Sequence, residues 1–226
     1  MILNLSQPRV YPHITYLDKI ASSELFVVSD DLVVKKNLFE IRNKYHCRLS
    51  NSSKYINIPI ECKTVFKELK IRETGFTDKH RKILYDNYKR YKYFDNDILE
   101  QAIPRKEYKW YLDYFNDQLS YFMDLFDIDT KITYASEVGS RKQKTERINE
   151  ILKHHKATLY VSGVRGADYL TNLDTDVIYH KTFDSRFSNE RANGSNGDML
   201  MVFDDIFAKG LDNVKNIIDG KNLHIL

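Results

Sequence analysis

The first 31 residues constrain the fold of this chain most, because two short apolar segments flank a proline-bracketed loop and a helical pattern. We expect a strand over residues 1–5, a loop over 7–12, a helix over 14–22 and a strand over 25–28. Such a β-α-β unit belongs to a parallel sheet, in which the polar residues that follow a strand commonly face a ligand crevice. The second strand ends in Ser29-Asp30-Asp31, so carboxylates are expected at that edge.

The middle of the chain changes character twice. We expect a β-rich patch over residues 32–62, where Ile56, Ile58 and Ile60 alternate with other side chains after a polar turn. Residues 77–127 then carry apolar side chains three and four positions apart, which predicts a helical insertion. Pro104 divides this insertion into at least two helices.

A second unit of strand, helix and strand follows the insertion. The expected elements are a strand over 131–138, a helix over 140–155, strands over 157–163 and 176–183, and a helix over 198–208 that Gly210 caps. The sequence therefore predicts an α/β fold: a Rossmann-like, mostly parallel sheet with a β-rich patch and a helical insertion. At 226 residues, one domain over the whole chain is the economical arrangement.

Charge and cysteine content exclude several classes of protein. The net charge is +3 from 35 basic and 32 acidic residues, which gives no general case for binding nucleic acid or a membrane surface. Cys47 and Cys62 fit neither a disulfide framework nor a four-ligand zinc site, so we expect reduced structural thiols. The first 20 residues lack the features of a signal peptide, and no apolar run approaches ~18 residues, so a cytoplasmic protein without membrane insertion is expected.

Three stretches of the sequence carry a family resemblance. The opening places, in order, Gln7-Pro8, Tyr11-Pro12, Tyr16, Lys19, Ile20, Asp30-Asp31, Lys36, Arg42-Asn43 and Ile58-Pro59-Ile60. The second stretch has His80, Ile83, Tyr88, Tyr91, Tyr93 and Phe94. The third has Lys144 to Ile148, Ala157 to Gly163 and Asp168-Tyr169-Leu170. These motifs resemble those of the WbqC-like protein family and cover most of the chain.

The resemblance implies a function in surface polysaccharide (O-antigen) biosynthesis. It implies acyl or aminoacyl (glycyl) transfer to the amino group of an amino sugar, with a nucleotide-linked amino sugar and an activated acyl donor as partners. The donor is a thioester or an aminoacyl-tRNA. The chain departs from the family pattern at Thr15, His13, Met201 and Ala208, which concerns the local pocket chemistry more than the fold.

Three residues are predicted to be catalytic. Asp30 and Asp31 end an apolar strand, where a carboxylate can remove a proton from an attacking amine; the alternative is an exposed strand-to-turn cap. His80 lies in the first turns of a helix for which Thr77 is the expected N-cap, and an imidazole suits general acid–base work. Its alternative is an ordinary surface histidine.

A second set is predicted to bind substrate: Gln7, Tyr11, His13, Lys36, Arg42, Asn43, Ser162, Gly163 and Tyr169. Arginine offers a planar fork for phosphate or carboxylate, and the turn after a strand offers backbone N–H groups. Ser162 is assigned to binding because the surrounding residues do not resemble the G-x-S-x-G motif of a nucleophilic serine. The sequence indicates no metal ligands and no particular cofactor.

Other functions stay open at this point. The strand-loop-helix opening also suits a nucleotide-using transferase with a nucleotidyltransferase-like core, and a non-catalytic binding protein of a glycan pathway is a third hypothesis. The basic, tyrosine-rich run over 79–92 suits a tRNA backbone or, more often, a solvated helix face. If the predicted strands are parallel, the site residues are expected to meet in one cleft, with the helical insertion as a lid.

Overall fold

The structure is a computed structural model that describes residues 1–34, 40–61, 64–163, 170, 173–180, 200–220 and 223–224. Its centre is a sheet in the order β5-β2-β1-β6-β7-β8. The strands are β1 (Ile2–Ser6), β2 (Leu25–Val28), β5 (Lys131–Tyr134), β6 (Leu159–Gly163), β7 (Asp176–His180) and β8 (Leu223–His224). All neighbouring pairs are parallel except β7 and β8. The expected α/β fold with a mostly parallel sheet is confirmed.

The strand order reverses between β1 and β6. From β1 the chain adds β2 and then β5 on one side, and it returns to place β6 and β7 on the other side. In open α/β sheets, the crevice at such a reversal, outside the carboxyl ends of the strands, is where ligands bind. The register pairs Asn4 of β1 with Val161 of β6 across this point.

Apolar side chains of β2 supply both faces of the sheet, because successive side chains of a strand point to opposite sides. Phe26 and Val28 belong to a large core cluster that includes residues of α1 (Ile14–Ala21). Leu25 and Val27 belong to a second cluster with residues of α6 (Lys144–His154). Four consecutive buried residues therefore make β2 an interior strand, as its sequence predicts.

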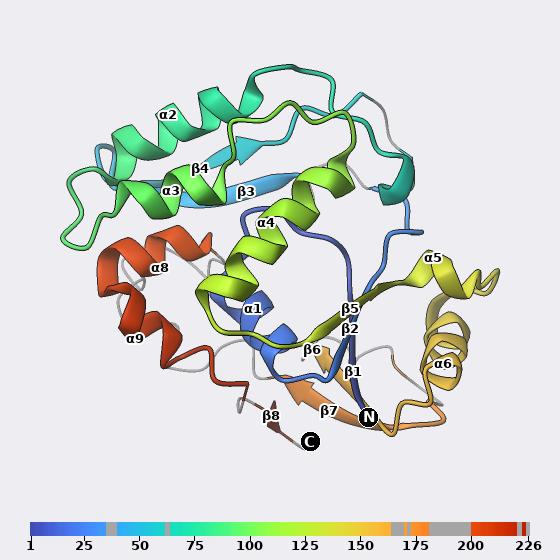
Figure 1. Cartoon of the computed structure of the whole chain (residues 1–226). Helices are drawn as coiled ribbons and strands as arrows, with labels where there is room; N and C mark the ends of the chain where they lie inside the picture. Colours follow the sequence, from blue (N-terminus) through green and yellow to red (C-terminus); the bar gives the residue numbers. More distant parts are fainter. Residues whose placement is uncertain are drawn as a thin grey trace.

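A second layer covers the carboxyl edge of the sheet, at the top of the molecule in Figure 1. It contains the antiparallel hairpin of β3 (Arg42–Cys47) and β4 (Ser52–Asn57), the short helix η1 (Phe66–Glu68), and the helices α2 (Phe76–Tyr88), α3 (Asn96–Ala102) and α4 (Tyr111–Leu125). The C-terminal helices α8 (Val202–Lys209) and α9 (Leu211–Lys215) lie against this layer. The expected β-rich patch and helical insertion are thus one structural layer.

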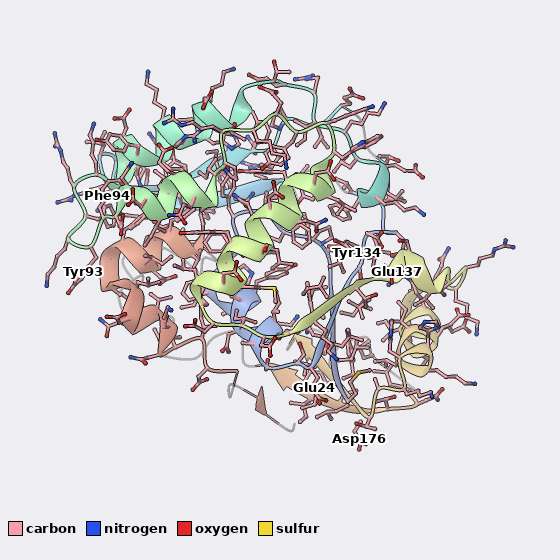
Figure 2. All side chains as sticks on the ribbon, viewed as in Figure 1. Glu24, Tyr93, Phe94, Tyr134, Glu137 and Asp176 are labelled. Atoms are coloured by element: carbon pink, nitrogen blue, oxygen red, sulfur yellow. The ribbon has the colours of Figure 1, made fainter. Side chains whose placement is uncertain are left out.

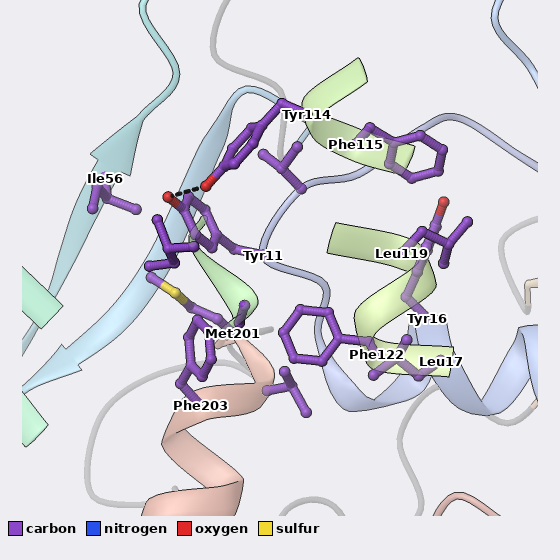
Figure 3. Close-up of a cluster of buried hydrophobic side chains, with 14 of the residues drawn as sticks. Tyr11, Tyr16, Leu17, Ile56, Tyr114, Phe115, Leu119, Phe122, Met201 and Phe203 are labelled. Atoms are coloured by element: carbon purple, nitrogen blue, oxygen red, sulfur yellow. Dashed lines mark hydrogen bonds between the residues drawn. The ribbon is translucent and has the colours of Figure 1, made fainter. Parts of the chain in front are cut away.

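Aromatic side chains fill the space between the two layers (Figure 3). Phe203 of α8 lies with its ring centroid 5.7 Å from that of Phe122 on α4 and 6.4 Å from that of Tyr11 in the opening loop. All three side chains are almost fully buried. Aromatic pairs at such distances contribute contact energy beyond their buried area, so this cluster joins three distant parts of the chain.

Several predicted boundaries are wrong, for local reasons. Residues 135–138 form the short helix α5 (Ala135–Val138) instead of extending a strand, because pairing with β2 ends at Tyr134 and the backbone N–H of Ser136 donates to Asp30. Thr77 is not an N-cap, because α2 already begins at Phe76 after Gly75, whose φ of 67° glycine adopts without strain. Residues 181–183 and 198–199 of the C-terminal predictions lie outside the described residues.

Candidate functional site

Polar residues follow four neighbouring parallel strands at one edge of the sheet. Ser6 ends β1, Asp30 follows β2, Ser136 follows β5, and Ser162 lies near the end of β6. Figure 2 shows this edge at Tyr134 and Glu137 and the opposite, amino edge at Glu24 and Asp176. Polar residues thus lie at the carboxyl ends of these four strands.

Asp30 is held there by two hydrogen bonds from one residue. The backbone N–H of Ser136 donates to Oδ1 over 2.9 Å, and the Ser136 hydroxyl donates to Oδ2 over 2.6 Å. The residue is only 2% exposed. A carboxylate oxygen can accept more than one hydrogen bond, so each oxygen keeps further accepting capacity after Ser136 is satisfied.

Asp31 forms a different contact on the side of α6. The guanidinium of Arg147 donates from Nε to Oδ2 over 3.0 Å, and its Nη2 donates to Oδ1 in a second bond of the same fork. The side chains are 8% exposed for Arg147 and 18% for Asp31. This bidentate geometry is the strong form of an ion pair, and it ties α6 to the end of β2.

Lys19 reaches the same edge from α1 and was not among the predicted site residues. Side chains of a helix tilt towards its N-terminus, and Lys19 Nζ donates to Ser6 Oγ over 3.1 Å at the end of β1. The Ser6 hydroxyl donates to Asn4 Oδ1, and Asn4 Nδ2 donates to the carbonyl of Val161 on β6 over 2.8 Å. Burial, together with the nearby charge of Arg9, lowers the pKa of Lys19 to about 8.

A second cation, Arg9, lies beside this chain of hydrogen bonds. Arg9 Nη2 is 3.9 Å from Glu40 Oε1, and the two side chains are 13% and 8% exposed. The guanidinium also lies 5.8 Å from the ring centroid of Tyr16. Burial lowers the pKa of Arg9, and the carboxylate of Glu40 partly offsets that effect. Within the described residues, Glu40 Oε2 is buried without a hydrogen-bond partner. Neither residue was predicted.

His80 belongs to a neutral network below the hairpin. Burial lowers its pKa to about 4, so the ring is neutral at pH 7. Nε2 lies 3.1 Å from the carbonyl of Asn57, which can only accept, so Nε2 carries the proton and Nδ1 accepts from Tyr11 Oη over 2.7 Å. Both ring nitrogens are therefore engaged.

The same network continues through two more side chains. Tyr114 Oη donates to Tyr11 Oη over 2.7 Å, and Gln118 Nε2 donates to Tyr114 Oη over 3.0 Å. Gln118 Oε1 in turn accepts from the backbone N–H of Tyr11 over 2.8 Å. This bond stabilises the unusual φ of 47° at Tyr11, a strained value for a residue with a large side chain.

The remaining predicted residues have mostly local roles in the described structure. His13 is the N-cap of α1, where Nδ1 accepts from the backbone N–H of Tyr16 over 3.0 Å. Arg42 lies over the ring of Tyr55, 3.9 Å from its centroid. Ser162 Oγ lies 3.2 Å from the carbonyl of Gly163.

Three predicted residues need separate mention. The backbone carbonyl of Gln7 accepts from Tyr16 Oη over 2.9 Å. Asn43 is buried on β3. Lys36 and Tyr169 lie outside the described residues, as does Cys62.

The predicted residues thus fall into two groups of contacts. Tyr11 and His80 contact each other, and Asn57, whose carbonyl accepts from His80, pairs in register with Arg42. The two aspartates contact α5 and α6 instead. Among the described residues, no hydrogen bond or ion pair joins the two groups, so the single cleft stays a prediction.

A surface depression of about 380 Å³ opens between α2 and α3. Arg81 and Glu100 line it and form an ion pair at 3.1 Å, and Arg105 adds a second contact to the same carboxylate. Its lining carries three cationic side chains and two carboxylates, so it keeps one positive charge in excess. In the described part of the chain, no group of three or more His, Cys, Asp and Glu residues is arranged to hold a metal ion. None of the described helices has the length and apolar character that crossing a bilayer requires.

Comparisons with known proteins agree with the motifs of the opening. The family model described as the WbqC-like protein family matches residues 7–186, a range that includes every predicted site residue and Lys19. Uncharacterized protein Rv1507c of Mycobacterium tuberculosis is 27% identical to the chain over 180 residues, which are 76% of each protein. No solved structure matches the chain.

Proposed function

The chain belongs to the WbqC-like protein family, and we propose that it transfers an acyl or aminoacyl group to the amino group of a nucleotide-linked amino sugar. The reaction would be a step of surface polysaccharide (O-antigen) biosynthesis, with a thioester or an aminoacyl-tRNA as donor. The observation that carries the proposal is the oriented carboxylate of Asp30 at the carboxyl edge of the sheet. Asp30 is the proposed general base.

The chemistry needs a proton acceptor beside the incoming amine. The amine nitrogen forms a bond to the acyl carbon, and the bond from that carbon to the thioester sulfur or to the ester oxygen of tRNA breaks. The nitrogen loses a proton, which passes through Asp30 to the leaving group. Ser136 fixes the orientation of the carboxylate, and among the described residues each oxygen accepts one hydrogen bond and so retains a lone pair for proton transfer.

The other two predicted catalytic residues have different surroundings. Asp31 is committed to Arg147, which favours a role in positioning α6 against the site. His80 would act as a base only if Tyr11 released Nδ1, because both ring nitrogens are engaged. The two residues remain alternatives to Asp30, and substitution distinguishes all three.

The test supplies the purified chain with a nucleotide-linked amino sugar and, in parallel, with an acyl thioester or glycyl-tRNA. Mass spectrometry then looks for the acylated sugar. Asp30→Asn should lower the turnover by about 10²- to 10⁴-fold, the usual contribution of a general base. The matched control is Asp129→Asn, an exposed aspartate just before β5 at the opposite edge, and its turnover should equal that of the wild type.

Three outcomes would contradict the proposal. Absence of product with every donor, although the sugar nucleotide binds, would indicate a non-catalytic binding protein. Turnover of a nucleoside triphosphate with Mg²⁺ would indicate the nucleotidyltransferase alternative. Full activity of Asp30→Asn together with an inactive His80→Gln variant would assign the role of general base to His80 instead of Asp30.

A further inference from the structure

The amino group of Lys19 is a cation at the place where the strand order of the sheet reverses. It donates to Ser6 at the end of β1, and the hydrogen bonds then pass through Asn4 to the carbonyl of Val161 on β6. These residues belong to the two strands that flank the reversal. The carboxyl ends of such strands are where open α/β sheets bind their ligands.

Within the described residues, Lys19 forms no ion pair with a carboxylate, although much of its stem is covered. Arg9 adds a second positive charge nearby, and Glu40, the acidic residue beside Arg9, is 3.9 Å from that guanidinium. The acidic neighbour of Lys19 on its own helix, Asp18, accepts from the backbone N–H of Gly220 over 3.0 Å. A covered charge without a counterion lowers stability, so its presence at a ligand crevice calls for a functional reason.

The bonding capacity of Lys19 indicates what kind of group would provide that counterion. An ammonium group has three N–H donors, and Ser6 accepts one of them. The Ser6 hydroxyl is itself directed to Asn4, so the position of the amino group is fixed, while its other two donors form no hydrogen bond with the described residues. A phosphate oxygen offers both negative charge and several lone pairs, and lysine commonly binds phosphate as a point charge.

We propose that Lys19, held by Ser6, is the core of a phosphate subsite at the carboxyl end of β1 that binds the diphosphate of the nucleotide-linked acceptor. The proposal rests on the proposed function, since it assigns the phosphate to the acceptor. It places the diphosphate at the reversal between β1 and β6, while Asp30 after β2 contacts the sugar amine one strand away. Lys19 is thus a binding residue and takes no part in the proton transfer.

Calorimetry with nucleoside diphosphates tests the subsite without any chemistry. UDP, GDP, CDP and dTDP are titrated into the wild type and into three variants. Lys19→Met removes the charge and keeps the stem, Lys19→Arg keeps the charge, and Lys131→Met removes an exposed lysine at the amino end of β5. The best nucleotide should bind Lys19→Met about 10- to 100-fold more weakly, as expected for a lost charge-assisted hydrogen bond.

The controls fix the interpretation of that loss. Lys19→Arg should recover much of the affinity, and Lys131→Met should bind like the wild type. Thermal unfolding of Lys19→Met should show no loss of stability, because the variant removes a covered charge that forms no ion pair with the described residues. A weaker affinity that accompanied a lower Tm, with no recovery by arginine, would overturn the subsite in favour of a packing role.

The pH dependence of binding is a second readout. Because burial and Arg9 lower the pKa of Lys19 to about 8, the free protein loses this charge above that pH, and a bound phosphate must restore it. The affinity for the nucleotide should therefore fall as the pH rises above about 8 in the wild type. In Lys19→Arg it should stay level over the same range, and equal behaviour of the two proteins would contradict the proposal.

Failure of the subsite and failure of the proposed function give different results. If no nucleoside diphosphate binds, or if all bind Lys19→Met as tightly as the wild type, the subsite is wrong, whatever the Asp30→Asn assay gives. If coenzyme A needs Lys19 for binding while the nucleotides do not, the phosphate belongs to the acyl donor and the acceptor assignment is overturned. An inactive wild type that still binds UDP through Lys19 would reject acyl transfer and keep the subsite.

Discussion

Two polar clusters in this molecule differ in how completely their hydrogen-bond donors and acceptors are paired. The cluster around His80 and Tyr11 is neutral and buried, and its donors and acceptors follow one another from Gln118 to the carbonyl of Asn57. The cluster at the carboxyl edge contains the charged groups of Asp30 and Lys19, whose acceptors and donors are only partly used by the described residues. A completed neutral network fixes a fold, whereas spare charged groups at a sheet edge can bind and transform a ligand.

The aromatic core beside His80 gives the largest expected effect. Replacing Phe203 by Ala should lower the free energy of unfolding by about 3–5 kcal/mol, because the ring is fully buried between Phe122 and Tyr11 and leaves a cavity. Urea unfolding at neutral pH measures the loss. The control Leu49→Ala, at a side chain that is 87% exposed, should change it by less than about 0.5 kcal/mol.

The same variant sharpens the comparison between the clusters. Below its Tm, folded Phe203→Ala should bind the best nucleoside diphosphate like the wild type, since the ring of Phe203 packs on the rings of Tyr11, Tyr88, Phe122 and Phe207, which belong to the other cluster and its surroundings. A loss of affinity comparable to that of Lys19→Met would mean that the two regions act as one unit.

The next effect is the pH dependence of stability due to His80. Its pKa is about 4 in the folded protein and 6.5 in the unfolded chain, so only the unfolded chain takes up a proton between these values. The free energy of unfolding is therefore unaffected by protonation of His80 above about pH 6.5. It falls by about 3 kcal/mol as the pH drops towards 4, because protons bind to the unfolded chain. The measurement is the unfolding free energy of wild type and His80→Gln at about pH 7 and about pH 4.5. The wild type should lose more stability than His80→Gln between the two pH values.

A matched histidine keeps this measurement specific. His154→Gln alters an exposed residue at the end of α6 and should change the pH dependence much less than His80→Gln does. If wild type and His80→Gln lose stability in parallel on acidification, the imidazole is not protected by burial, and a catalytic role for His80 gains support.

A smaller effect is expected from the hydroxyl that links His80 to Tyr114. Tyr11→Phe leaves Nδ1 of His80 without its donor and removes the acceptor of the Tyr114 hydroxyl, at a cost of about 1–3 kcal/mol. Tyr85→Phe, an exposed tyrosine on α2, is the control. Because Tyr11→Phe also frees Nδ1, an increase in transfer activity with this variant would assign the proton transfer to His80 and contradict the structural interpretation.

The sequence predicts the sheet well because runs of consecutive apolar residues mark its strands. Leu25 to Val28 are four consecutive apolar residues, and the strand has those bounds. The end of β5 was mispredicted because the turn into α5 depends on Asp30, 106 residues away from Ser136. Local patterns cannot indicate such a distant hydrogen bond.

The candidate site shows the same limit. His80 has charged neighbours in the sequence, a pattern that indicates a surface position. In the structure it is buried by the hairpin and by Tyr11, which lies 69 positions earlier in the chain. The position of Lys19 on an amphipathic helix indicates a solvated residue. Its place at the edge of the sheet follows from the hydrogen bond of its amino group to Ser6, which the local pattern does not indicate. Asp30 was predictable, because a carboxylate after a buried strand emerges at the carboxyl edge whatever the distant contacts are.

The smallest expected effect separates orientation from reaction at the carboxyl edge. In Ser136→Ala the backbone N–H still donates to Oδ1 of Asp30, while the bond of 2.6 Å to Oδ2 is lost. The free energy of unfolding should fall by about 1 kcal/mol and the turnover by less than about tenfold, because the proton acceptor itself remains. Ser50→Ala, in the exposed turn of the hairpin, is the control for both measurements.

If Ser136→Ala were as inactive as Asp30→Asn, orientation alone could not account for the loss. The hydroxyl would then be a candidate to accept the acyl group, with Asp30 as the base that activates it, and the direct transfer to the sugar amine would have to be replaced by a two-step reaction.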